Sequence, residues 1–345
     1  VQVGNNVGSG TTVDIDEMWG FLSSPTLGTL RFGDGDAAAA LLQVRAPFVG
    51  LASVDGYWDE FAARGPDTLA PYLISGVTDG ADATKLVYLS PQFFGFDFGV
   101  SYAPNGREGE GTSSVISPIS LFGNGAGAQL QRDRFDFRRN EFTYGARYRG
   151  SFGNVGLAAS FVGTVAQPQK LLPSATNGAG QNPVSGAGFE TITAYSLGVN
   201  VTAFGFTAGG EYTWGNYAGP STGLLAQRAG LRASTNWALS TTYTAGPIRV
   251  GGFYGQGTRD NGNLAVIGNG ISVAGNTLVA AALPDRRQTV WGFGAAYTIA
   301  PGMDLVANYT RVNDRNLANN ALNPLYIVQS RREIDFFMLG TRIAF

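Results

Sequence analysis

The sequence predicts an all-β fold, a transmembrane antiparallel β-barrel formed by one domain over residues 1–345. Two observations support this fold class. Apolar or aromatic residues alternate with small or polar residues in repeated segments of about nine to twelve residues, as in strands with one apolar and one hydrated face. Short turns between these segments alternate with long Gly- and Asn-rich stretches, which is typical of barrels with short periplasmic turns and long external loops.

Thirteen segments follow the alternation and are predicted to be strands. In Gly95 to Tyr102, Phe96 and Phe98 flank Asp97, so the two faces of that segment differ in polarity. Val1 to Asn5 would be the tail of one more strand, which brings the visible total to about fourteen. The thirteen are Val13 to Leu22, Gly28 to Gly33, Thr84 to Ser90, Gly95 to Tyr102, Asn140 to Gly150, Val155 to Val165, Thr191 to Thr202, Phe206 to Tyr217, Ala233 to Thr244, Ile248 to Gly257, Arg287 to Ile299, Met303 to Val312 and Glu333 to Phe345.

The composition excludes several classes of protein. No stretch approaches the roughly 18 uninterrupted apolar residues of a transmembrane helix. A net charge of −2 and a pI near 5.3 argue against a nucleic-acid partner, which requires a dense basic surface. The chain contains no His and no Cys, which removes Ser-His-Asp triads, Cys-His pairs and His-ligated zinc. We therefore predict that the protein is not an enzyme.

Three segments resemble a known family. The terminal residues Phe336 to Phe345 are similar to the last strand of outer-membrane proteins, which ends on Phe. The run Leu27 to Asp34, followed by a long stretch and then by Leu86 to Pro91 and Gly95 to Tyr102, resembles the general bacterial porin family in its alphaproteobacterial version. The resemblance covers essentially the whole chain.

The resemblance implies a sixteen-stranded barrel in the cell outer membrane, surrounded by membrane lipid and lipopolysaccharide and assembled as a homotrimer. It implies passive diffusion of small hydrophilic solutes and ions through a water-filled channel. Gly28 to Gly33 would be the fifth strand, and residues 34–83 would form a loop that folds inward and narrows the pore. Val1 to Asn5 would then match the end of the third strand, so we expect an incomplete N-terminus.

If residues 34–83 fold inward, their acidic side chains are candidates for a pore constriction opposite basic wall residues, because opposed charges tune the selectivity of a channel. A short helix is predicted between Ser53 and Gly65. The alternative is that these acids are solvated loop charges and that the arginines are strand-end residues at the membrane surface. The acidic candidates are Asp34, Asp36, Asp55, Asp59, Glu60 and Asp67; the basic candidates are Arg31, Arg147, Arg149, Arg249 and Arg342, with Lys85 and Arg287 as further possibilities.

No cofactor is expected apart from a possible calcium ion. Asp34 and Asp36, and separately Asp14, Asp16 and Glu17, offer the hard carboxylate oxygens that Ca²⁺ prefers. Acidic residues beside Gly are also ordinary turn residues, and neither run has EF-hand spacing.

Two other functions remain open. A solute-specific outer-membrane channel would need a binding track in the lumen, to which Tyr195 and Phe253 would contribute. A non-conducting surface barrel or adhesin would use its long loops to bind a partner. The loop Asn105 to Arg139 carries Arg107, Arg132, Arg134, Arg138 and Arg139, which could contact lipopolysaccharide or a neighbouring subunit.

Overall fold

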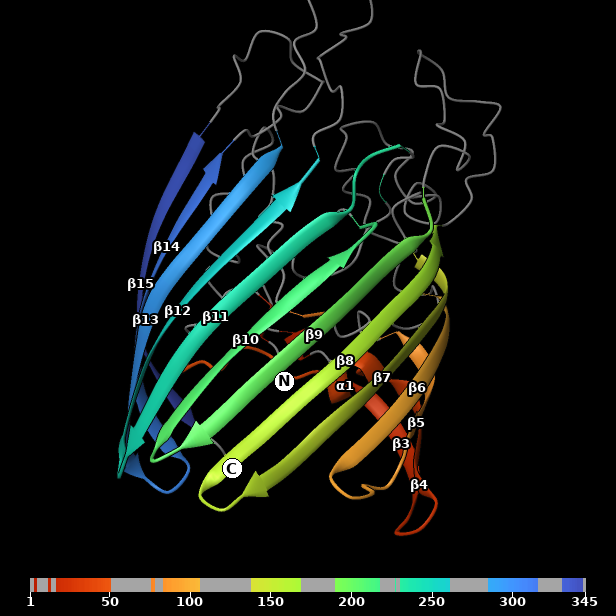
Figure 1. Cartoon of the computed structure of the whole chain (residues 1–345), viewed down its shortest axis with the longest axis horizontal. Coiled ribbons are helices and arrows are strands. Elements are labelled where there is room, and N and C mark those ends of the chain that lie inside the picture. The colour runs from red at the N-terminus through yellow and green to blue at the C-terminus, as the bar shows by residue number, and fades with distance from the viewer. Residues whose placement is uncertain are drawn as a thin grey trace, which may run out of the picture.

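The computed structural model describes residues 3–4, 12–13, 17–50, 76–77, 83–105, 138–168, 190–217, 227, 230–260, 285–315 and 331–343. Thirteen antiparallel strands, β3 to β15, form one strongly curved sheet in which every strand pairs with its neighbours in sequence (Figure 1). They are β3 Met18–Ser24, β4 Gly28–Asp34, β5 Thr84–Leu89, β6 Phe96–Asn105, β7 Arg138–Phe152, β8 Val155–Pro168, β9 Ile192–Ala203, β10 Phe206–Gly215, β11 Ser234–Ala245, β12 Ile248–Arg259, β13 Arg286–Ala300, β14 Met303–Arg315 and β15 Arg331–Ile343. The all-β fold class is confirmed.

Twelve of the predicted strands are confirmed with bounds that shift by at most three residues. The strand predicted over Val13 to Leu22 is confirmed only in its second half, because Met18–Leu22 belong to β3. Its first residue belongs to β2 (Thr12–Val13), which pairs with β1 (Val3–Gly4) in a separate two-stranded sheet, and the large sheet begins only at Met18. Pairing two segments that are close in sequence costs little loop-closure entropy, which favours this local sheet. Within the predicted strand tail Val1 to Asn5, the described residues Val3 and Gly4 thus pair outside the large sheet.

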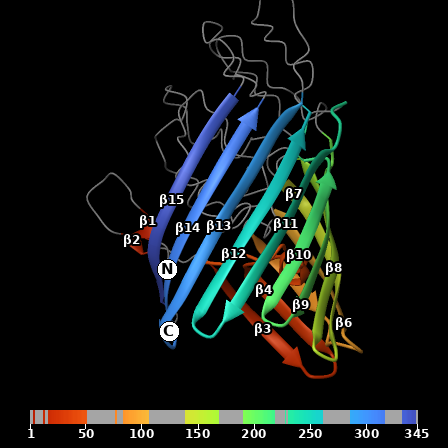
Figure 2. The same cartoon turned by 60° about the vertical axis from the view of Figure 1, so that its left-hand side comes forward.

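The sheet curves round so that its strands enclose an interior, and they tilt steeply relative to its axis (Figure 2). Among the described residues the two edge strands, β3 and β15, do not pair with each other. The short connections all lie at one end, which we call the turn end, and glycines in the left-handed region such as Gly205 (φ 82°) and Gly246 (φ 56°) close them. None of the helices in the described part is long and apolar enough to cross a membrane.

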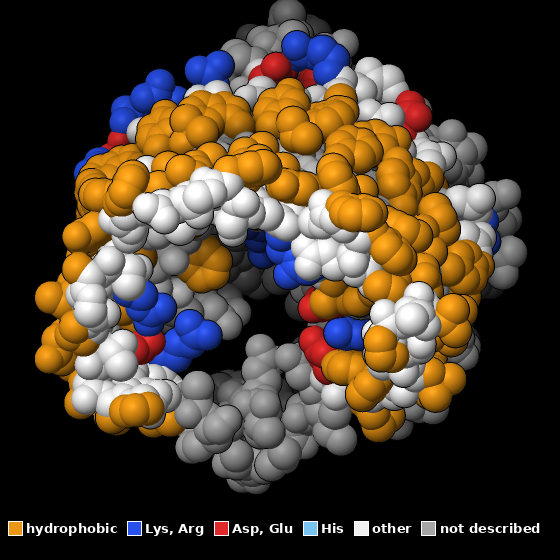
Figure 3. Space-filling model, turned by 60° about the horizontal axis from the view of Figure 1, so that its bottom comes forward, with side chains coloured by type: hydrophobic (Ala, Val, Ile, Leu, Met, Phe, Trp, Pro, Cys, Tyr) orange, Lys and Arg blue, Asp and Glu red, His pale blue; other side chains and the backbone are white. Residues whose placement is uncertain are grey.

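The outer face of the sheet is apolar. Leu239, Phe293, Phe337 and Leu339 point outward and are between 59% and 72% exposed. Such side chains cover the outside of the molecule, whereas charged side chains appear in the hollow (Figure 3). A soluble protein does not expose a continuous apolar belt of this kind, but a barrel surrounded by lipid does.

Residues 35–50, which we call the strap, leave β4 and cross the inner face of the sheet. The strap starts with the short helix α1 (Ala38–Leu42), which contacts β5, β6, β7 and β8. Its apolar side chains pack on the wall in three small clusters, around Leu42, Ala46 and Val49. The core of this protein thus lies between the strap and the inner wall. The sequence did not predict α1, and the helix predicted between Ser53 and Gly65 lies outside the described residues.

Candidate pore constriction

Polar side chains on the inner wall hold the first part of the strap. The backbone N–H of Ala38 donates to Ser101 Oγ (3.1 Å), and that of Ala39 donates to Thr143 Oγ1 (3.2 Å). The two hydroxyls also bond each other at 2.7 Å. Because the first N–H groups of a helix have no partner within the helix, these wall hydroxyls act as its cap. Both occupy inward positions of the alternating pattern.

The second part of the strap is anchored further along the wall. The Val44 N–H donates to Ser160 Oγ at 2.6 Å, and the Ala46 N–H donates to Glu211 Oε2 at 3.1 Å. Glu211 is only 6% exposed, so its carboxylate is buried between the strap and the wall. A hydrogen bond from a backbone amide to a carboxylate is stronger than one between neutral groups. These contacts fix the height at which the strap crosses the lumen.

A glycine lets the strap approach the wall closely. A Cβ placed on Gly198 would lie 1.7 Å from the carbonyl oxygen of Val44. On the same strand, Asn200 Nδ2 donates to the carbonyl oxygen of Arg45 at 2.9 Å. Strand β9 therefore combines close backbone contact with a specific hydrogen bond.

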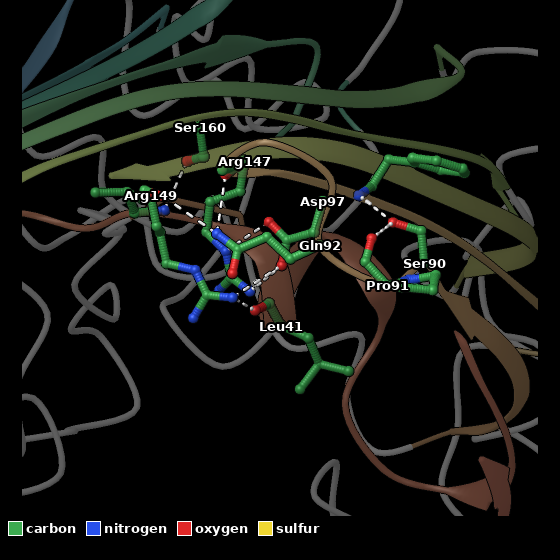
Figure 4. Close-up of polar contacts among 11 residues, drawn as sticks. Leu41, Ser90, Pro91, Gln92, Asp97, Arg147, Arg149 and Ser160 are labelled. Carbon is green, nitrogen blue, oxygen red and sulfur yellow. Dashed lines mark hydrogen bonds and ion pairs between the residues drawn. The ribbon is translucent and has the colours of Figure 1, made fainter. Parts of the chain in front are cut away.

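The first charged group of the lumen joins two predicted arginines to one aspartate. Arg147 forms a bidentate pair with Asp97, from Nε to Oδ1 at 3.1 Å and from Nη2 to Oδ2 at 2.5 Å (Figure 4). Arg149 Nη2 reaches the same Oδ2 at 3.2 Å, and its side chain remains 50% exposed. Arg147 Nη1 also donates to the carbonyl oxygen of Leu41 at the end of α1, at 3.1 Å. Arg147 thus supports the strap, whereas Arg149 faces the water-accessible lumen.

The second charged group lies on the inner face of β12, β14 and β15, near the turn end. Arg249 on β12 forms an ion pair with Asp304 on β14, and Thr298 Oγ1 donates to the same carboxylate at 2.7 Å. Arg342 on β15 is the direct cross-strand neighbour of Asp304 and is exposed. This group repeats the composition of the first one: two arginines and one aspartate.

The remaining basic candidates differ in their surroundings. The guanidinium of Arg31 lies 4.4 Å from the centre of the Trp19 ring, a cation–π contact on the inner face. Lys85 is also on the inner face, but it is buried under the strap and donates to the carbonyl oxygen of Gly35. Arg287 is exposed on the outer face, so its prediction as a pore residue is wrong. Arg287 points to the same face of β13 as Trp291 and Phe293, because even numbers of positions separate the three residues.

Of the acidic candidates, the structure describes Asp34 and Asp36. Asp34 accepts a hydrogen bond from Thr84 Oγ1 and faces outward together with Phe32, because Arg31 and Lys85 take the inward positions, so its prediction as a constriction residue is wrong. Asp36 is the second residue of the strap and is partly buried. Among the residues described, no group of three or more His, Cys, Asp or Glu side chains is placed to hold a metal ion, so calcium at Asp34 and Asp36 stays a prediction. Asp14 and Asp16 are not described, nor are Asp55, Asp59, Glu60 and Asp67.

The sequence analysis missed the carboxylates that the predicted arginines contact. Asp97 and Asp304 are on the wall itself, not on the inward loop. A signal for them existed, because both occupy inward positions of strands adjacent to strands that carry inward arginines. The prediction placed wall arginines opposite loop acids. In the structure, acidic residues of the wall also contribute negative charge to the lumen, and they pair directly with the predicted arginines.

Two aromatic candidates do not form a track in the lumen. Tyr195 lies on the outer face, where its ring is 5.8 Å from that of Trp214. Phe253 does face inward, but it is 7% exposed and packs in the cluster around Ala46. Arg138, proposed as a lipopolysaccharide contact, is buried and paired with Glu141 at 3.1 Å.

A sequence model of the Gram-negative porin family matches residues 1–317 of the chain. Among curated proteins no significant match is found. Residues 1–317 include the strap and all strands from β3 to β14.

Several solved outer-membrane channels are similar in structure. The anion-selective porin from Comamonas acidovorans is 13% identical, with 94% of this chain and 76% of that chain covered and a TM-score of 0.48. The channel DcaP of Acinetobacter baumannii is 12% identical, with 99% and 78% covered and a TM-score of 0.48. OmpF of Salmonella typhi, in complex with daunomycin, is 14% identical, with 94% and 77% covered and a TM-score of 0.45. Identity at this level gives no residue-by-residue correspondence.

Proposed function

The chain belongs to the Gram-negative porin family, and on this premise we propose that it is a water-filled channel for passive diffusion of small hydrophilic solutes and ions. It is a β-barrel protein of the outer membrane. Membership of a channel family supports transport rather than catalysis, in agreement with the lack of histidine and cysteine in the sequence.

The observation that carries the proposal is the pair of charged groups on the inner wall, below a strap that crosses the interior. Arg149 and Arg342 are exposed toward the lumen, and each lies beside an aspartate. Charged and hydrated walls favour polar solutes and resist apolar ones. The strap narrows the interior without filling it with apolar side chains, since its apolar residues pack against the wall.

A solute-specific channel is less well supported. It would need a series of lumen-facing aromatic or hydrogen-bonding residues, and the two aromatic candidates point outward or are buried. A non-conducting surface barrel is opposed by the exposed charges of the lumen, which have no evident role in a plugged barrel. We further propose a homotrimer, which the resemblance to general bacterial porins implies.

Single-channel conductance of the detergent-extracted protein in planar bilayers tests the proposal. We expect conductance steps that grow nearly linearly with salt concentration, because a water-filled pore conducts ions in proportion to their bulk concentration. Closure in groups of three would support the trimer. Saturation of the current by one class of solute would favour the solute-specific channel. Absence of conductance from correctly folded protein would contradict the diffusion pore.

A further inference from the structure

Three arginines form a row on the outer face at the loop end of the last three strands, the end opposite the short turns. Arg287 on β13 is the direct cross-strand partner of Arg315 on β14, which is in turn the partner of Arg331 on β15. All three side chains are exposed. Directly opposed residues of a sheet have Cβ atoms about 5 Å apart, and like charges in such positions destabilise the sheet. An anion beside a row of three guanidinium groups would therefore stabilise it by offsetting the repulsion.

The row lies just beyond the apolar belt. Outward-facing aromatic residues occupy one level of successive strands, including Tyr195, Trp214, Trp237 and Trp291, and mark the boundary between hydrocarbon and headgroups. Arg287 is two outward positions beyond Trp291 on the same strand. At about 3.3 Å per residue and a tilt near 40°, this places its guanidinium roughly 10 Å further out. That is the depth of lipid headgroups.

Carboxylates near the row neutralise it only in part. Glu333 binds both Arg331 and Arg311, the latter at 3.0 Å, while Asp335 accepts a hydrogen bond from Tyr309 at 2.6 Å. Four outward arginines, Arg287, Arg311, Arg315 and Arg331, thus face two outward acids, Glu333 and Asp335, which leaves a net charge of 4 − 2 = +2. We call these six residues the basic rim.

Other parts of the same boundary carry no net positive charge; Arg232, just before β11, is paired with Asp260 and Asp285. Above the aromatic level, β11 and β12 present the paired residues Thr235 and Thr258. On β7 and β8, Asn140 and Gln167 occupy the corresponding place and bond each other at 3.2 Å. The positive charge is therefore specific to β13–β15 within the described residues and is not a general property of the boundary.

We propose that the basic rim binds the phosphate groups of lipopolysaccharide in the outer leaflet. Arginine suits this role because its planar guanidinium donates two parallel hydrogen bonds to a phosphate and stays charged at every physiological pH. The headgroup depth of the row and its net positive charge match an anionic lipid that lies beside the barrel.

A second copy of the chain fits the basic rim less well. A protein partner would need an acidic outer surface, and among the described strand residues the outward-facing acids are Glu333 and Asp335, within the rim itself, and Asp34 on β4, which already binds Thr84. Subunit contact is therefore the competing outcome of the test. The inference depends on the outer-membrane location and not on whether the pore conducts.

The test compares binding of lipopolysaccharide to the folded, detergent-solubilised protein and to the double variant Arg287→Gln/Arg315→Gln. Both changes leave Arg331 and its carboxylate partner in place. The matched control is Thr235→Gln/Gln167→Ala, which alters uncharged parts of the same boundary whose cross-strand partners lie outside the basic rim. Three probes are used: phosphorylated lipopolysaccharide, enzymatically dephosphorylated lipopolysaccharide and inorganic phosphate.

We expect the arginine double variant to lose roughly tenfold or more in affinity for phosphorylated lipopolysaccharide, as the loss of two cations at a membrane surface implies. The control should bind like the wild type, and dephosphorylated lipopolysaccharide should bind weakly to all three. Conductance should not change. If the glutamine variant fails to fold, Arg287→Lys/Arg315→Lys keeps the charge and loses the bidentate geometry, and we expect an intermediate affinity.

Three results would overturn the proposal. One is equal affinity of the wild type and the arginine variant for phosphorylated lipopolysaccharide. Another is equally tight binding of inorganic phosphate, which would identify a site for free anions. The third is loss of the oligomer in the arginine variant with unchanged lipid binding, which would identify the basic rim as a subunit contact.

Discussion

The two faces of β13–β15 use arginine in opposite ways near the loop end. On the inner face, Arg286 and Arg332 both bind Asp314, and the Arg286 and Asp314 side chains are 3% and 0% exposed. On the outer face, Arg287 and Arg315 are exposed and lie side by side in the basic rim. Neighbouring residues of one strand, such as Arg286 and Arg287, thus belong to different environments because successive side chains point to opposite faces.

The difference shows that the surroundings of a charged side chain determine which partner it needs. A buried cation requires a carboxylate within hydrogen-bonding distance, because the interior supplies no water to solvate it. An outward cation at the membrane boundary can instead find water or an anionic headgroup. Substitutions on the inner face should therefore affect stability, whereas those on the outer face should affect binding.

Asp314→Asn should have the largest effect on stability. The change leaves Arg286 buried with a weakened partner, and we expect a loss of about 3 to 5 kcal/mol in the free energy of unfolding. The matched outer change, Glu333→Gln, removes the carboxylate that Arg311 and Arg331 share in exposed ion pairs and should cost about 0 to 1 kcal/mol. Urea unfolding in detergent, followed by tryptophan fluorescence, measures both values. Similar costs for the two variants would contradict the assignment of faces.

Gly198→Val should displace the strap. The added Cβ would occupy the position of the Val44 carbonyl oxygen, so the strap must move away from β9. We expect a changed single-channel conductance, most simply an increase as the strap leaves its seat. Gly340→Ala is the control, because its Cβ would meet its nearest neighbour, a Val306 methyl, at an ordinary 3.7 Å. Wild-type conductance from a folded Gly198→Val protein would show that the position of the strap does not determine the width of the constriction.

Asp97→Asn and Arg149→Gln should shift ion selectivity in opposite directions. The first removes a negative charge from the lumen wall, and the second removes an exposed positive charge from the same group. Reversal potentials under a salt gradient should move toward anion preference for Asp97→Asn and toward cation preference for Arg149→Gln. A shift of the same sign in both would exclude electrostatic control by this group.

The smallest expected effect concerns lipid binding by Glu333→Gln. Loss of this carboxylate releases Arg311 and Arg331 and raises the net charge of the basic rim by one. We expect phosphorylated lipopolysaccharide to bind a few times more tightly, since one charge near a membrane surface contributes about 1 kcal/mol. Weaker binding would mean that Glu333 is itself part of the lipid site.

The alternating pattern predicted most of the sheet because lipid on one side and water on the other impose a strict period of two on every strand. The same period placed Arg147, Arg149 and Arg249 on the inner face. It failed for Arg287, at the start of β13, where the belt no longer requires apolar residues on the outer face. At strand ends the polarity of a residue no longer indicates the face on which it lies. The face of such a residue can be assigned only when its cross-strand partners are known.

The strap could not be predicted in detail for a different reason. Its position depends on contacts with strands that are distant in sequence, such as those of Ala39 with Thr143 and of Ala46 with Glu211. Helix α1 is also too short for caps or amphipathic periodicity to reveal it. The run of alanines at residues 37–40 is compatible with a helix but has no stop signal beyond it.

The most direct test of the account uses the absence of cysteine from the sequence. A single thiol is introduced on each face, as Arg149→Cys in the lumen and Arg287→Cys in the basic rim, and each protein is treated with an anionic thiol reagent during a bilayer recording. The account predicts a stepwise change in current for Arg149→Cys and no change for Arg287→Cys, although both thiols react. Unchanged current after labelling of Arg149→Cys, or a current change for Arg287→Cys, would contradict a water-filled lumen lined by the inner face.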